Sequence, residues 1–423
     1  MNKRVVVTGL GVVSPNGTDV PAFLEAIRSG KSGLQFVPQY RELNFNCQVS
    51  GIPQFEFNDL KNYLPETVLY GLKSRGVGYG VKAAAEAWVN AGNQIETGEP
   101  LWDTGCVFGN SVGDSELIKT VITKVDRHEA RKIGSRMVEQ IMLSGVSAYI
   151  EGMLGLGNKV ITNSAACATG TQAILMGYEY IKYGMTKRMI VGSSEHVDQY
   201  IFGSFDAMRI LPRKFNDEPY KASRPMSTSA SGFVPSSGAA ALVLEDLDFA
   251  LSRNAMIYAE VLGGFSNSGG QKCGGSMTSP NSKGVMKCIL EALTVSDVQA
   301  SAIDLISGHL TATHADLTEI QNWSEVLQRK GQNFPKINSL KSMIGHCLSA
   351  AGSIESIAVI LQIFHQFIHP NINLEDPNPA ITNIIDKVCL PVECEDAGVN
   401  VVAKANFGFG DVNSCLIFSK FKI

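Results

Sequence analysis

Cys167 is the residue of this sequence whose surroundings most favour chemistry. It lies between Ala166 and Ala168, where the strand-like run 160–162 gives way to a helical pattern over 169–183. Small neighbours permit a sharp strand-to-helix turn that would expose a nucleophile, and the backbone N–H at such a turn can stabilise an oxyanion. A thiol at the start of a helix is expected to favour the thiolate. The alternative is a buried structural cysteine, which is the commonest role of a free thiol.

Two histidines in the second half of the chain are further candidates. His309 and His346 each follow a strand-like run, and Lys341 precedes His346 by five residues. In an α/β sheet these places lie at strand ends, where sites form, although a lone histidine is more often a core or surface residue. His314 could join His309 as a metal ligand, but the sequence offers no evident third ligand, so we expect no metal.

A third candidate is Gly408-Phe409-Gly410, which closes the strand-like run VNVVAKANF. The simple interpretation is a turn. The functional interpretation is a mobile loop in which the N–H of Phe409 is a second oxyanion donor and its ring is a gate that Gly408 and Gly410 allow to swing.

The elements that must position these residues alternate between strand and helix, which predicts an α/β protein with much parallel sheet. The order of elements also recurs, which predicts a duplicated unit: residues 1–253 carry the cysteine, and residues 254–423 carry the histidines and Lys341. The second copy opens near 257–261. We expect strands at 4–7, 105–108, 188–192 and 239–245, and helices at 81–91, 169–183 and 349–365.

Composition excludes several classes of protein. The 423 residues include 44% hydrophobic and 18% charged ones, and the net charge of −4 provides no general surface for nucleic acid. Nine cysteines without a C-x-x-C pair favour a reducing compartment, and we expect the cytoplasm. We expect no stretch to reach the length of a membrane span; residues 356–368 come closest, but they contain the polar side chains of Gln362, His365 and Gln366.

Motifs in a fixed order run through the whole chain: VVVTGLGVVSPNG, then SAACATG around Cys167, ASRPM, SGFVPSSGAAALVLED, KSMIGH and NFGFG. In this order and spacing the sequence resembles β-ketoacyl-acyl carrier protein synthases of the elongating type II class, within the thiolase superfamily. The resemblance implies a thiolase-like fold of two similar halves in a five-layered α-β-α-β-α arrangement. It also implies a dimer, acyl carrier protein as partner, and no cofactor beyond the pantetheine arm of that carrier.

The resemblance implies a role for each candidate residue. Cys167 would accept the acyl chain as a thioester, and the amides of Cys167 and Phe409 would form an oxyanion hole. His309 and His346 would assist decarboxylation of malonyl-carrier protein, with electrostatic support from Lys341. The other implied roles are a structural or water-linked acid (Glu319), pantetheine contacts (Thr311, Thr313), acyl-pocket lining (Val112, Phe205) and carrier docking in a basic segment (Arg131, Lys132).

Some residues depart from the family pattern. Leu310 stands where the family usually has glycine, Asp411-Val412 replaces Gly-Thr after the glycine loop, and Pro235-Ser236-Ser237-Gly238 replaces Leu-Gly-x-Gly. A synthase for a specialised acyl chain, such as a polyene or aryl polyene, would accommodate these changes. So would one member of a heterodimer with a chain-length factor.

Two other classes can be weighed on the sequence. Gly9-Leu10-Gly11 faintly resembles a dinucleotide fingerprint, but Ser14 replaces the third glycine and Pro15 stands where the phosphate-binding helix should run. A non-catalytic partner, like a chain-length factor, would typically have lost the cysteine. Cys167, His309, His346 and Lys341 are all present. We therefore favour a competent condensing enzyme over a dinucleotide-binding protein and over a non-catalytic partner.

Overall fold

The computed structural model describes residues 3–95 and 98–422, and its centre is a ten-stranded sheet. Two small antiparallel ribbons accompany it, β2 (Leu34–Phe36) with β3 (Val49–Gly51), and β11 (Phe367–Ile368) with β12 (Glu395–Asp396). In spatial order the large sheet contains β10 (Lys336–Asn338), β9 (Leu305–Ser307), β13 (Val401–Gly408), β14 (Val412–Ser419), β8 (Ala259–Ser268), β1 (Val5–Val13), β7 (Gly238–Asp246), β6 (Arg188–Glu195), β4 (Thr104–Gly109) and β5 (Val160–Ile161).

The sheet consists of two halves with the same internal pattern. From the middle outward, β1, β7, β6, β4 and β5 correspond to β8, β14, β13, β9 and β10, and each pair of neighbours has the same direction in both halves. The halves meet where β1 pairs with β8 over three residue pairs, from Val5↔Val261 to Val7↔Ala259. The duplication predicted from element order is therefore present in the topology. The predicted boundary between residues 253 and 254 falls in the connection that leads into β8 and stays a prediction.

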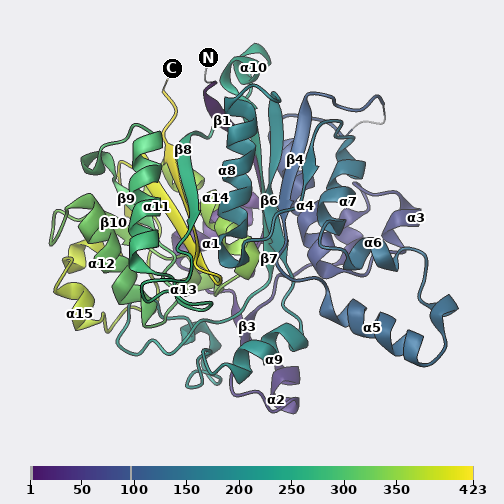
Figure 1. Cartoon of the computed structure of the whole chain (residues 1–423), viewed down its shortest axis with the longest axis horizontal. Coiled ribbons are helices and arrows are strands. Elements are labelled where there is room, and N and C mark those ends of the chain that lie inside the picture. The colour runs from purple at the N-terminus through teal and green to yellow at the C-terminus, as the bar shows by residue number, and fades with distance from the viewer. Residues whose placement is uncertain (1–2, 96–97, 423) are drawn as a thin grey trace.

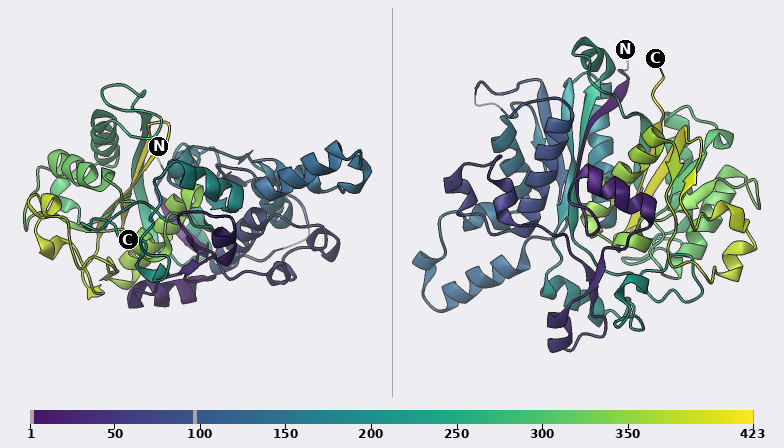
Figure 2. Two further views of the ribbon diagram at one scale, coloured as in Figure 1. Left: turned by 90° about the horizontal axis from the view of Figure 1, so that it is seen from below. Right: turned by 180° about the vertical axis from the view of Figure 1, so that it is seen from behind.

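Helices form the remaining layers (Figures 1 and 2). The outer helices α4 (Arg75–Asn90) and α7 (Gly145–Leu154) cover the first half, and α11 (Ser282–Val295) and α12 (Ala315–Leu327) cover the second. Between the halves lie α8 (Thr169–Lys182) and α14 (Ala351–His365), which contact each other and strands of both. The result is the thiolase-like α-β-α-β-α arrangement expected from the resemblance.

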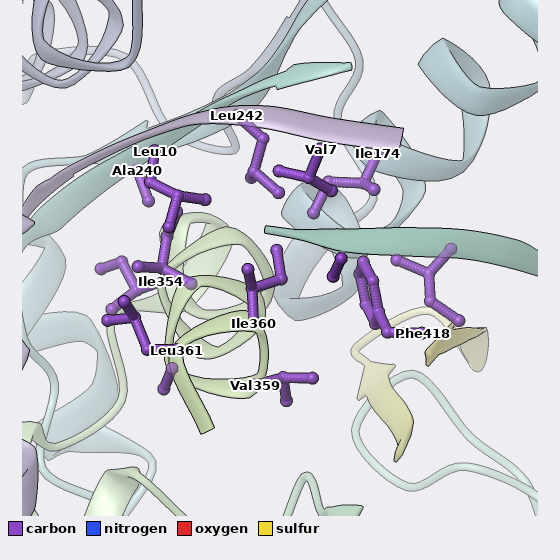
Figure 3. Packing of buried hydrophobic residues seen from close by; sticks show 14 of the residues in the cluster. Val7, Leu10, Ile174, Ala240, Leu242, Ile354, Val359, Ile360, Leu361 and Phe418 are labelled. Carbon is purple, nitrogen blue, oxygen red and sulfur yellow. The ribbon is translucent and has the colours of Figure 1, made fainter. Parts of the chain in front are cut away.

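The core is packed around α14 (Figure 3). Ile354 and Ile360 of this helix face Val7, Leu242 and other strand side chains that are fully buried. The helical run Leu348–His365 is long and apolar enough to cross a membrane, so the expectation that no stretch reaches that length was wrong. Because 89% of this run is buried inside the fold, its hydrophobicity is accounted for by its place in the central layer.

The two glycines of Gly9-Leu10-Gly11 lie within strand β1 and not in a phosphate-binding turn. A Cβ on Gly11 would lie 2.0 Å from the carbonyl oxygen of Ala83, and one on Gly9 would lie 2.2 Å from that of Ala87. Both glycines therefore allow α4 to pack closely on the sheet, which explains the motif without a dinucleotide.

The sequence predicted most of the long helices and strands correctly, but it predicted some of their ends wrongly. The first strand extends to Val13, beyond the predicted 4–7, and α4 begins at Arg75, where Ser74 caps it by accepting from the N–H of Val77. The other helices are α1 (Val20–Ser29), α2 (Pro38–Glu42), α3 (Glu66–Leu69), α5 (Ser115–Asp126), α6 (Met137–Ile141), α9 (Gln199–Ala207), α10 (Leu247–Ser252), α13 (Lys341–Ile344) and α15 (Pro379–Thr382).

Candidate active site

Cys167 sits in a single 3-10 turn, Ala166–Ala168, that leads directly into α8. Thr169 holds this turn, since its hydroxyl accepts from the N–H of Ala165 at 2.8 Å and donates to the carbonyl of Ala166 at 2.7 Å. Ala166 has a φ of +46°, a left-handed conformation that a side chain as small as a methyl group can adopt at modest cost. The turn presents the partly exposed thiol to a cavity.

The second half of the chain builds the same turn in front of α14. Its 3-10 segment Leu348–Ala350 also opens on a residue with a φ of +46°, Leu348. Ser349 thus occupies the place that Cys167 has in the first half, but its hydroxyl is buried and donates to Glu195 at 2.7 Å. His346 lies two residues before Leu348. The two related turns therefore supply a nucleophile from one half and an imidazole from the other.

The predicted central residues meet in space. A nitrogen of His309, a nitrogen of His346 and the sulfur of Cys167 lie within 4.8 Å of one another. The two imidazole rings are 5.4 Å apart between centroids and nearly perpendicular, at 83°. All three side chains line one cavity of about 790 Å³. A substrate carbonyl in this cavity can therefore contact the nucleophile and both rings.

Hydrogen bonds fix the tautomer of both histidines. The Nδ1 atom of His346 accepts from the N–H of Leu348 at 3.2 Å. The Nδ1 atom of His309 lies 3.1 Å from the side-chain amide nitrogen of Asn406, which donates to it. A neutral imidazole that accepts at Nδ1 carries its proton at Nε2. Both rings are thus set to offer an Nε2–H donor.

A buried ion-pair network lies behind the histidines. Lys341 bonds one carboxylate oxygen of Glu355, and Lys404 lies 2.7 Å from the other. Burial, and after it the charge of Lys341, lowers the pKa of His346 to about 3. The pKa of His309 is lowered well below its usual value by burial and then by Lys341. The histidines are therefore neutral donors across the physiological pH range.

Burial also corrects the expectation that the site favours a thiolate. It raises the pKa of Cys167 to about 11, although Lys341 and the backbone of Phe409 act in the opposite direction. Desolvation thus outweighs the helix start in setting the resting charge. Cys167 rests as a thiol, and its proton must leave during acyl transfer.

Alkylation should report this directly. Because only a fraction of about 10⁻⁴ of the thiol is ionised at pH 7, the rate of Cys167 modification by iodoacetamide should rise about tenfold per pH unit from 7 to 9. Peptide mass spectrometry would follow Cys167 separately from the exposed Cys273 and Cys394. A rate at Cys167 that is already constant above pH 7 would contradict the raised pKa.

The glycine loop packs against the cysteine turn. A Cβ on Gly408 would lie 3.0 Å from the carbonyl oxygen of Ala165 and 3.1 Å from the amide nitrogen of Cys167, so only glycine fits comfortably there. The amide of Phe409 lies within hydrogen-bonding reach of the Cys167 sulfur. The Phe409 ring lies 6.4 Å from that of Phe205, edge to face, across the cavity. The glycine loop thus brings the amide of Phe409 next to the turn that carries Cys167.

Asp411, one of the departures, has a definite structural task. Its buried carboxylate accepts from the N–H groups of Gln271 and Asn281, both at 2.9 Å, and its carbonyl accepts from Gly269 at 2.8 Å. Residues 278–280 of the same segment line the cavity. Asp411 therefore ties the glycine loop to a cavity wall, which a glycine at this position would not do.

Replacing Asp411 with alanine should lower the free energy of unfolding by about 3 kcal/mol, because the N–H groups of Gln271 and Asn281, the second of them buried, lose a charged acceptor. Urea unfolding measures this change. The exposed Asp217 provides the control, and Asp217→Ala should leave the midpoint unchanged. Equal midpoints for the two variants would show that the bonds of Asp411 add nothing to stability.

The residues predicted to contact the substrate line the cavity. Val112, Phe205, Thr311 and Thr313 all contribute to its wall. Glu319, expected as a structural or water-linked acid, has a structural role: its oxygens accept from the N–H of His309 at 2.7 Å and of Leu310 at 2.8 Å.

Leu310 has a φ of +20°, which L-residues rarely adopt and which explains the glycine usual in the family. Its amide bond to Glu319 is one restraint. The other is the hydroxyl of Ser339, which donates to the Leu310 carbonyl at 2.9 Å. These two bonds hold the strained backbone next to His309.

Arg131 and Lys132 lie outside the cavity, in an exposed 3-10 turn that follows α5. Lys132 pairs with Glu129 at 2.6 Å, an exposed contact of little energetic weight. The arm formed by α5 projects from the body of the molecule (Figures 1 and 2).

Sequence reasoning missed Glu355, Lys404 and Asn406. Glu355 carried a usable signal, since it is a lone carboxylate in the helical run GSIESIAVI, where apolar residues face all sides. Lys404 and Asn406 lie in a central strand whose two faces are both buried, so alternation gave no sign of which way they point.

Cys167, His309 and His346 also form the kind of donor group that could hold a metal ion. Their environment does not suit one. A metal at either Nε2 atom needs the lone pair that the proton occupies, and both Nδ1 atoms already accept from N–H donors. The tautomers thus favour hydrogen-bond donation to a substrate oxygen over metal ligation.

A thiolase-like fold whose two halves bring together a cysteine at a helix start and two histidine donors defines a condensing enzyme. Comparison with known proteins gives the family. Residues 2–250 match the N-terminal domain of β-ketoacyl synthases and residues 258–375 match their C-terminal domain. The chain belongs to the β-ketoacyl synthase family, whose members are acyltransferases.

Individual relatives cover the whole chain. It is 30% identical to 3-oxoacyl-(acyl-carrier-protein) synthase 1 of Haemophilus influenzae over 426 residues, 99% of each protein. A β-ketoacyl synthase from Burkholderia phymatum superposes with a TM-score of 0.90 at 28% identity, covering 99% of this chain and 100% of that one. The ishigamide ketosynthase/chain length factor (TM-score 0.88, 28% identity) and a type II polyketide ketosynthase in complex with its acyl carrier protein (0.86, 27%) align over 100% of both chains.

Proposed function

We propose that this protein is a 3-oxoacyl-acyl carrier protein synthase that joins a cysteine-bound acyl chain to malonyl-carrier protein. The observation that carries the proposal is the approach of Cys167, His309 and His346 to within 4.8 Å in one cavity. The names of its relatives support the same substrate class. The chain retains Cys167, His309, His346 and Lys341, which a non-catalytic chain-length-factor-like partner would not need. Their presence favours the catalytic function over that alternative.

In the first half-reaction the acyl group moves to Cys167. The sulfur attacks the thioester carbonyl of the acyl carrier protein, and the oxyanion that forms lies against the amides of Cys167 and Phe409. The bond to the pantetheine sulfur breaks, and the proton that leaves Cys167 ends on that sulfur. Carrier thiol and acyl-enzyme are the products, so no charge is gained or lost.

In the second half-reaction the histidines act as donors. The Nε2–H groups of His309 and His346 hydrogen-bond the thioester oxygen of the malonyl group, which lets its carboxylate leave as CO₂ and the bonding electrons form an enolate. The enolate carbon attacks the acyl carbonyl on Cys167, the C–S bond breaks, and the sulfur takes a proton from solvent. Neutral donors suit this step because they stabilise developing charge without a buried permanent charge.

No metal or redox group enters this balance, and the tautomers of both histidines support a reaction that proceeds without a metal.

The nine cysteines, none of which is paired in the described chain, suit a reducing compartment such as the cytoplasm.

Acyl carrier protein is the proposed partner, with Arg131 and Lys132 at its docking surface. Carrier proteins are acidic, so Arg131→Glu should lower kcat/KM about tenfold with acyl carrier protein and leave the reaction of an acyl-pantetheine thioester unchanged. Lys330→Glu, another exposed charge reversal, is the control. Equal losses with both substrates would place the effect in the cavity and not at a docking surface.

We also propose that the protein is a dimer, of this chain alone or with a chain-length-factor-like homologue. Strand β5 forms an open edge of the sheet, and α5 has no buried residue. Its apolar side chains Ile118, Ile122 and Val125 are 37%, 54% and 51% exposed. Light scattering of the purified chain should give twice its 45.5 kDa. A mass of 45.5 kDa that doubles only with an added homologue would select the heterodimer.

The decisive experiment supplies purified protein with malonyl-carrier protein and a series of acyl-carrier proteins that bear saturated, polyene and aryl chains. Mass spectrometry should find a 3-oxoacyl carrier two carbons longer, together with one CO₂ per turnover. The fastest chain type identifies the substrate. Failure of every chain to form an acyl-enzyme at Cys167 would overturn the proposed function.

A further inference from the structure

Lys404 is an unusual residue for this site because it is a fully buried second lysine on a single carboxylate. Its ammonium lies 2.7 Å from Glu355, 2.8 Å from the carbonyl of Ala405 and 2.6 Å from the Oδ1 atom of Asn406. Lys341 already pairs with Glu355. Two ammonium groups on one carboxylate leave a positive charge in excess, and burying that charge costs free energy. A task in the site would account for this cost.

The contacts of Asn406 show what that task is. Its Oδ1 atom accepts from Lys404 and from the hydroxyl of Thr171. Its Nδ2 atom donates to Glu355 at 3.0 Å and to the Nδ1 atom of His309 at 3.1 Å. Every hydrogen-bonding position of the amide is thus occupied, and the partner on each side decides which end faces it.

Lys404 favours this one orientation of the Asn406 amide. An ammonium group only donates, so the amide must turn its oxygen to Lys404 and therefore its NH₂ group to His309. With the amide reversed, two donors would face each other at Lys404, and Oδ1 would face the carboxylate of Glu355. Lys404 and Glu355 together thereby determine the atom that His309 meets.

We propose that Lys404 and Asn406 are positioning residues that hold His309 as its Nε2–H tautomer, with the donor directed at the malonyl thioester oxygen. The proposal rests on the proposed function for its catalytic consequence, but the tautomer itself does not depend on that function. Burial lowers the pKa of His309 most, and the charges of Lys341 and His346 come next. Lys404 lowers it in the same direction by a smaller amount. The ring is thus kept neutral and correctly protonated by the same group.

Two variants separate these contributions. Lys404→Met leaves Glu355 paired with Lys341, so the buried network stays balanced and the protein should fold. Asn406→Leu removes the amide while keeping its approximate size. The matched control is Asn16→Leu: Asn16 is also buried but bonds Ser14 and the carbonyl of Lys31 and contacts no histidine.

The first readout is the histidine ¹⁵N spectrum of each protein, with the His309 signals assigned by loss in His309→Gln. Wild type and Asn16→Leu should show His309 protonated at Nε2. Both Asn406→Leu and Lys404→Met should move those signals toward a mixture of tautomers. An unchanged His309 signature in both variants would overturn the proposal, whatever the enzyme does.

The second readout compares the half-reactions. Loss of one preorganised donor should slow malonyl-carrier protein decarboxylation about 10²-fold, while acylation of Cys167, which does not use His309, should stay within about twofold. Equal slowing of both steps would indicate a general structural defect and overturn the proposal. If wild-type protein forms neither acyl-enzyme nor CO₂, the proposed function fails, and the ¹⁵N measurement still decides the role of Lys404.

Discussion

Cys167→Ala is expected to abolish acyl-enzyme formation and to lower the condensation rate by about 10⁴-fold or more, because Cys167 is the one thiol among the described residues that line the cavity. Intact-protein mass after mixing with acyl-carrier protein measures the first effect, and formation of the 3-oxoacyl product measures the second. The variant should lose one half-reaction and keep the other. Decarboxylation of malonyl-carrier protein uses the histidines, so it should persist in the variant.

Cys47→Ala is the matched control, since Cys47 is buried in another part of the fold, where it lies near the carbonyl of Val49. It should acylate at the wild-type rate. An acyl adduct that persists in Cys167→Ala would place the nucleophile elsewhere. Loss of decarboxylation together with acylation would show that Cys167 also takes part in the enolate step.

Glu355→Gln is expected to have the largest effect on stability. It leaves Lys341 and Lys404 side by side in the interior with no carboxylate between them. Burial alone would raise the pKa of Glu355, but the two lysines outweigh it and lower the pKa to about 2, so the group is ionised at all working pH values. Removing one member of a buried pair costs about 3–5 kcal/mol, and the free energy of unfolding in urea should fall by that amount or more.

The double variant Glu355→Gln/Lys404→Met tests this cause. It removes one of the two uncompensated charges, so it should unfold at higher urea than Glu355→Gln alone. Glu325→Gln, on the exposed face of α12, should change nothing measurable. A double variant less stable than the single one would show that the bonds of Lys404, and not its charge, dominate.

The sequence could locate the site because its reactive residues follow recognisable local patterns. Cys167 stands among small residues at a strand-to-helix junction, and His309 and His346 follow short strands. These patterns also identified the duplicated α/β organisation, which the matching strand orders of the two halves display. The proximity of the three side chains was expected only through the family resemblance, since the spacing along the chain carries no such information.

What the sequence could not give depends on burial. The thiolate expectation for Cys167 considered the helix start but not the desolvation that raises the thiol pKa. For Glu319 the resemblance implied a structural or a water-linked acid, and only its bonds to two backbone amides show the structural role. Lys404 looked like an ordinary strand residue, because in a strand that is buried on both faces a charged side chain has no pattern to mark its partner.

The two related turns, each opening at a φ of +46°, have a consequence for how the catalytic groups are divided between the two halves. Each half of the chain contains one complete copy of the scaffold but only part of the chemistry, the sulfur in one and the imidazoles in the other. The first copy has a cysteine sulfur where the second has a serine whose hydroxyl is held in hydrogen bonds. Catalysis therefore depends on the contact between the two copies: neither half alone contains the complete set of reactive groups, so neither half is expected to be active without the other.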